Sequence, residues 1–66
     1  GPTHPTTALS LNNLALLLQA TGDYAAARPL YERALAITEQ ALGFAHPTTQ
    51  TIRANLAALD SLANEG

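Results

Sequence analysis

The sequence predicts an all-α protein in which a helix-turn-helix unit is followed by a third helix. Alanine and leucine, which are both strong helix formers, supply 26 of the 66 residues. The motif His4–Thr7 recurs as His46–Thr49, which gives an internal repeat with a period of 46 − 4 = 42 residues. Gly22 and Gly43 interrupt the helical pattern and divide the chain into three stretches.

The repeat extends beyond its first motif. At the same offset of 42 residues, Asn13–Ala15 aligns with Asn55–Ala57, and Leu17 aligns with Leu59. Two matched blocks at one offset indicate a true repeat in so short a chain. The sequence therefore predicts one full repeat over residues 4–45 and the first half of a second over residues 46–66. Residues 1–3 are interpreted as a leader left by removal of a purification tag.

The helix boundaries follow from capping residues. Pro5 and Pro47 suit the first turn of a helix, where the missing N–H would have no intrahelical partner. Gly22 followed by Asp23 indicates a helix stop and then an N-cap, and Gly43 begins the second break. We therefore expect helices over residues 5–21, 24–42 and 47–63. Short connections make each of them antiparallel to the next.

Helical phase separates a predicted core from the surface. In the first helix we expect a core stripe of Leu11, Leu14 and Leu18, widened by Ala15 and Leu17. The predicted core positions of the second and third helices are Ala27, Leu30, Tyr31, Ala34, Thr38 and Ala41, followed by Ile52, Leu56, Leu59 and Ala63.

With these residues placed, the sequence resembles the tetratricopeptide repeat, and specifically the 42-residue subclass seen in kinesin light chain. The resemblance runs from His4 to Leu42, and the third helix repeats its opening. The matching features are Leu14–Ala15, the turn Gly22–Tyr24, the packing positions Ala27, Tyr31 and Ala34, the stretch Arg28–Tyr31, and the joint His46–Pro47. The resemblance implies a fragment of an α-solenoid that serves as a protein-interaction scaffold.

Two positions depart from the general pattern of the family. Leu11 stands where the consensus prefers tryptophan, although the 42-residue subclass tolerates leucine there. Arg53 occupies the same register in the third helix, so that this helix is less suited to packing against a further repeat and is interpreted as a terminal cap.

The resemblance also implies where a partner binds, because the first helix of each repeat in this family lines a concave face. Asn13 and Asn55 match the asparagine that hydrogen-bonds the backbone of a bound peptide in that family. Independently, Leu9 and Leu16 point roughly 150° away from the predicted core stripe of their helix. The alternative is that such exposed leucines are ordinary surface residues and that the asparagines bond a turn or water. The candidate partner-binding residues are Asn13, Asn55, Leu9, Asn12, Leu16 and Arg53.

Composition argues against other classes of function. With three basic residues and a formal net charge of −2, the chain has no electrostatic footprint for nucleic acid, and no apolar run has the roughly 20 residues that span a membrane. His4 and His46 are interpreted as helix-entry residues rather than metal ligands. We therefore expect no enzyme, cofactor or metal site, and the absence of cysteine favours a cytoplasmic location. The carboxylates Glu32, Glu39 and Asp60 are interpreted as a solvated face.

Two functions stay open at this point. The first is a non-catalytic module that binds a peptide or protein segment on its concave face. The second is self-assembly into a homo-oligomer, because about three repeats are normally needed for a stable solenoid. In that case the chain would be a repeat fragment or designed repeat protein with no partner of its own, and copies would associate, including by exchange of a helix across the joint Gly43–His46.

Overall fold

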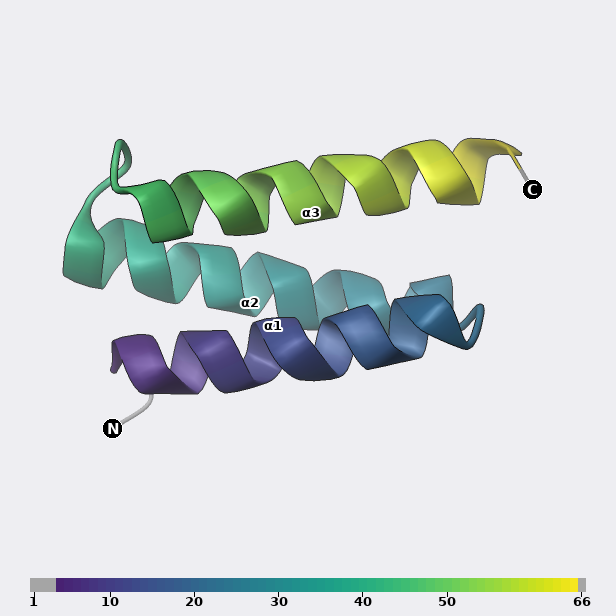
Figure 1. Ribbon diagram of the computed structural model, residues 1–66, viewed down its shortest axis with the longest axis horizontal. Coiled ribbons are helices and arrows are strands. Elements are labelled where there is room, and N and C mark those ends of the chain that lie inside the picture. Colours follow the sequence, from purple (N-terminus) through teal and green to yellow (C-terminus); the bar gives the residue numbers. More distant parts are fainter. Residues whose placement is uncertain (1–3, 66) are drawn as a thin grey trace.

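The computed structural model describes residues 4–65, which form three α-helices and no strand (Figure 1). Helix α1 spans Pro5–Ala20, α2 spans Tyr24–Leu42 and α3 spans Pro47–Glu65. The all-α fold and the three predicted helices are confirmed, and the ends of α1 and α3 differ from the predicted ends by one and two residues. The predicted leader lies outside the described residues.

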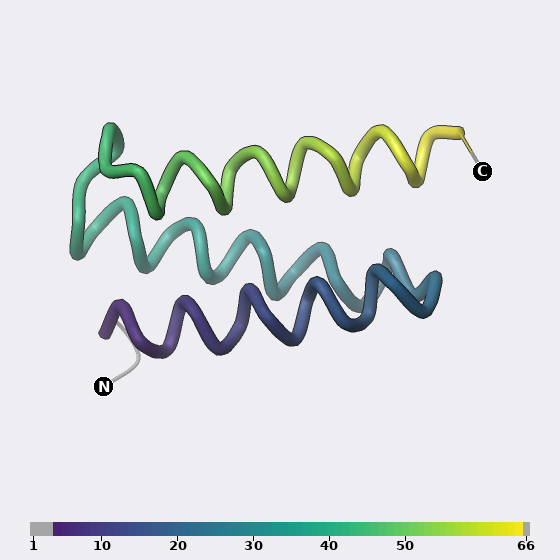
Figure 2. Tube along the Cα trace, viewed as in Figure 1, coloured from purple at the N-terminus to yellow at the C-terminus, as the bar shows by residue number. Residues whose placement is uncertain are grey.

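The helices are arranged as an antiparallel series. Figures 1 and 2 show α1 and α3 running in the same direction, with α2 running in the opposite direction and packed against both. In these views α2 lies behind the other two helices, so α1 and α3 lie on the same side of it. The first helices of two successive repeats therefore share one face of the molecule.

Each helix start is fixed by a side chain that accepts a backbone hydrogen bond. The imidazole Nδ1 of His4 accepts from the backbone N–H of Thr6 at 3.1 Å, and His46 accepts from Thr48 in the same way at 3.1 Å. The carboxylate of Asp23 caps α2. These bonds satisfy N–H groups that have no partner within the helix. The structure thus gives both histidines the helix-entry role that the sequence indicates.

The two predicted breaks adopt conformations that favour glycine. Gly22 has φ 85° and Gly43 has φ 98°, in the region where a Cβ atom is strained. At the first break the Asp23 N–H donates to the carbonyl of Leu18 at 2.9 Å, which closes the end of α1. The chain can therefore reverse within three residues and place α2 directly against α1.

The core consists of two clusters along the helix axes. The first contains Ala8, Ala34, Ile37 and Ile52, and the second contains Ala15, Ala27, Tyr31 and Leu59. Each cluster takes residues from all three helices, and alanines at the α1–α2 contact let these helices approach closely. In both clusters, small side chains pack against large ones from the other helices. This packing holds the full repeat (α1 and α2) and the half repeat (α3) together.

The predicted core stripe of α1 is wrong at two positions. Leu14 is 46% exposed and Leu17 is 61% exposed, whereas Ala8 and Ala15 are fully buried. The buried side of α1 is centred on its alanines, because α2 can pack closely only where the side chains are small. Leu11 and Leu18, at the edge of that side, are half-buried. In the other helices most of the predicted core is confirmed, but Ala41 is exposed and the unpredicted Ile37 is buried.

Tyr31 is the largest fully buried side chain, and its environment predicts a loss of stability at high pH. Its hydroxyl donates to Gln19 Oε1 at 2.7 Å, and burial raises its pKa above the ordinary value of 10.0. The unfolded chain therefore ionises first, so the contribution to stability is complete below pH 10.0 and is lost as pH rises toward the folded pKa. We expect the free energy of unfolding in urea to be steady from pH 7 to about pH 10 and to fall as the pH is raised further. Tyr31→Phe should remove the part of this decrease in unfolding free energy that comes from ionisation of the Tyr31 hydroxyl.

Candidate partner-binding surface

Three of the candidate residues form one exposed strip along α1. Leu9 is 48% exposed, Leu16 is 41% exposed, and Asn13 lies exposed between them. Asn13 is four residues after Leu9 and three before Leu16, so the three side chains are neighbours on the helix surface. The strip combines two apolar side chains with an amide that can both donate and accept hydrogen bonds.

Asn12 and Asn55 are held together by a bond between α1 and α3. The Asn55 side-chain amide donates to Asn12 Oδ1 at 3.1 Å. Asn12 is only 7% exposed, so it belongs to the interior rather than to the surface. Asn55 is half-buried, and this bond uses one of its two amide hydrogens. The sequence did not predict this contact, because its two partners come from different repeats and unequal repeat positions.

The bond between the asparagines locates the exposed strip relative to α3. Leu9 is three residues before Asn12 and Leu16 is four residues after it, so both leucines flank the point where α1 touches α3. The strip Leu9, Asn13 and Leu16 therefore runs along the border between α1 and α3.

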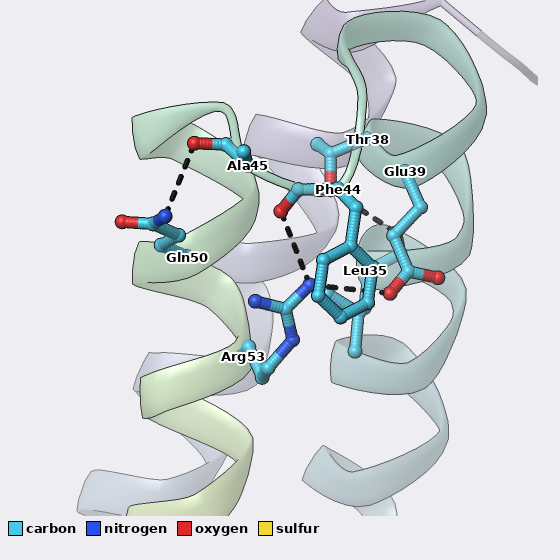
Figure 3. A network of polar contacts seen from close by, with 7 residues as sticks. All are labelled: Leu35, Thr38, Glu39, Phe44, Ala45, Gln50 and Arg53. Carbon is cyan, nitrogen blue, oxygen red and sulfur yellow. Dashed lines mark hydrogen bonds and ion pairs between the residues drawn. The ribbon is translucent and has the colours of Figure 1, made fainter.

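Arg53 lies in a different environment from the other candidates. Its guanidinium donates to Glu39 Oε2 at 3.3 Å and to the Phe44 carbonyl at 3.3 Å, and it stacks at 3.8 Å from the centroid of the Phe44 ring (Figure 3). Figure 3 shows these partners on α2 and on the α2–α3 turn. Arg53 thus fastens α3 to the preceding helix and turn rather than extending the strip on α1.

A second ion pair joins α2 and α3. Arg28 of α2 pairs with Asp60 of α3, seven residues along α3 from Arg53. The side chains of Glu39 and Asp60, which the sequence places on a solvated face, are 36% and 46% exposed, and each pairs with an arginine. Such partly exposed pairs contribute little free energy, but together they fix the register of α3 on α2.

The surface around the strip is open. Within residues 4–65 there is no enclosed pocket, and no group of three or more potential ligands is placed to hold a metal ion. Nor does this part of the chain contain a helix that is long and apolar enough to cross a membrane. The strip is open, mostly apolar and free of charged side chains along α1.

Comparison with known proteins agrees with the repeat and the fold. Residues 7–48 match the family model of the tetratricopeptide repeat, which covers 48 − 7 + 1 = 42 residues and equals the period read from the sequence. A search of curated proteins finds no match to the chain. The matched family mediates protein–protein interaction in general. The predicted resemblance is therefore confirmed.

Proposed function

Because the chain belongs to the tetratricopeptide repeat family, we propose that it is a non-catalytic protein-interaction module that binds a peptide or protein segment along the border of α1 and α3. The observation that supports this function is the exposed strip of Leu9, Asn13 and Leu16. Apolar side chains of the partner would cover the two leucines, and the Asn13 amide would bond the partner's backbone.

The other candidate residues have supporting parts in this proposal. Asn55 contributes the side-chain amide hydrogen that is not used in its bond to Asn12. Asn12 and Arg53 hold α1, α2 and α3 in place, so they support the surface without touching the partner. Since α1 carries no charged residue, the segment that fits best is apolar and uncharged at its anchors. The surface is small, so we expect affinities that are micromolar or weaker.

Selection from a randomised peptide library tests this function. The chain is immobilised and used to select displayed peptides, and each recovered peptide is measured against three variants. We expect Leu9→Glu to weaken binding at least about tenfold, because it places a charge under an apolar anchor. Asn13→Ala should weaken binding less. Leu14→Glu, with similar exposure but on another side of α1, should leave binding unchanged. The proposal fails if no recovered peptide depends on Leu9 or Asn13.

Self-assembly is the second candidate function, and one observation favours it. Leu14 and Leu17 are exposed although the repeat places them at packing positions. Association of copies of the chain would bury these two side chains.

A further inference from the structure

The two histidines of the chain occupy the same structural position in its two repeats. His4 directly precedes α1, and His46 directly precedes α3. In each case the imidazole Nδ1 accepts a hydrogen bond at 3.1 Å from the backbone N–H two residues later, which belongs to Thr6 or to Thr48. The first helix of each repeat therefore begins on the same imidazole cap.

This cap requires an uncharged imidazole. In the neutral ring one nitrogen carries a proton and the other accepts a hydrogen bond, whereas in the protonated ring both nitrogens are donors. Protonation of His46 would therefore place an N–H donor against the N–H donor of Thr48. It would also put a positive charge at the end of the helix where the backbone dipoles are already positive. Both effects act against the helix start, and both apply equally to His4.

The charged groups around the two caps do not compensate for these effects. Because α2 runs opposite to α1 and α3, both caps lie at the end of the molecule where α2 finishes (Figure 1). Helix α1 carries no charged residue, and the charged side chains of α2 and α3 at this end, Glu39 and Arg53, pair with each other at 3.3 Å. A carboxylate that already pairs with a guanidinium attracts a nearby imidazolium little. The other carboxylates of the described residues lie farther along the helices or at their opposite ends, namely Asp23, Glu32, Asp60 and Glu65.

The composition of the chain makes the two caps stand out in the range around neutral pH. Histidine is the side chain that ordinarily changes its charge between about pH 5 and pH 8. The chain has two histidines and no cysteine, so the side chains that ordinarily titrate in this range are both helix caps. Both are exposed, so that a proton from the solvent can reach them in the folded chain.

We propose that His4 and His46 form a pH-sensitive pair of caps, through which mild acid destabilises the starts of α1 and α3 together. In the unfolded chain an imidazole gains a proton without losing a hydrogen bond, whereas in the folded chain it must give up its bond to Thr6 or Thr48. The unfolded chain therefore binds more protons, and the stability of the fold decreases as the pH falls.

Urea unfolding at pH 7.5 and pH 5.5, followed by circular dichroism, tests the inference. We expect the folding equilibrium constant of the unsubstituted chain to be at least about tenfold lower at pH 5.5. In the double variant His4→Asn with His46→Asn, the asparagine oxygens accept the same bonds and do not titrate, so the constant should change by less than about twofold. Each single variant should keep part of the decrease.

An alanine variant separates the loss of a cap from the effect of pH. His46→Ala has no cap on α3 at either pH, so its folding equilibrium constant should already be about fivefold below that of the unsubstituted chain at pH 7.5. The further decrease at pH 5.5 should match that of His46→Asn, because the same cap no longer titrates in both. These measurements use no partner, so their outcome does not depend on the proposed function.

Two results would overturn the inference. One is a folding equilibrium constant of the unsubstituted chain that is the same at pH 7.5 and pH 5.5. The other is a decrease that the double asparagine variant shows in full, which would assign the pH dependence to other groups of the chain.

Discussion

Replacing Leu59 by alanine should cost about 3 kcal/mol of unfolding free energy, because the side chain is fully buried against Ala15, Ala27 and Tyr31. A single core in a chain of this size rarely supplies more than about 3–5 kcal/mol. Leu59→Ala should therefore leave a large part of the population unfolded at room temperature. Circular dichroism against urea concentration measures the change.

The repeat provides a matched control for that substitution. Leu17 holds the equivalent position in the first repeat but is 61% exposed. Leu17→Ala should change the unfolding free energy by no more than about 0.5 kcal/mol, measured at a concentration where the chain is monomeric. Equal effects at the two positions would contradict the assignment of Leu59 to the core and of Leu17 to the surface.

Replacing Asn55 by alanine should cost about 2 kcal/mol, because it leaves Asn12 Oδ1 buried without its partner. Asn13 is the equivalent residue of the first repeat and lies exposed. Asn13→Ala should change the unfolding free energy by no more than about 0.5 kcal/mol. The same chemical substitution thus has different consequences at two repeat positions, and chemical denaturation of both variants measures them.

A double substitution separates the bond from the burial of its partners. If the bond stabilises the fold, Asn12→Ala should cost much less in the Asn55→Ala background than in the unsubstituted chain. If the two effects are simply additive, the bond between α1 and α3 contributes nothing measurable. Asn55 would then be as free as Asn13 to bind a partner.

The sequence was enough to predict the architecture, because the signals that define it are local or periodic. The caps at His4, Asp23 and His46 and the stops at Gly22 and Gly43 mark the helix ends within a few residues of each break. The recurrence of the His4–Thr7 motif fixed the repeat and therefore the order of the helices. None of these inferences needed information about which side chains meet between helices.

The details of the surface could not be predicted in the same way. Leucines occupy almost every side of α1, so periodicity alone did not reveal that α2 packs on Ala8 and Ala15 rather than on Leu14. The Asn12–Asn55 bond joins residues 43 positions apart, and no spacing rule predicts it.

Chemical-shift mapping with a selected peptide is the most direct test of the claim that the strip on α1 is the partner-binding surface. The leucine methyl groups and the asparagine side-chain amides are observed while the peptide is added. We predict saturable shifts at Leu9, Leu16 and Asn13, with Leu14 and Leu17 unchanged. A bound peptide that shifts only Leu14 and Leu17, or none of these five residues, would contradict the claim.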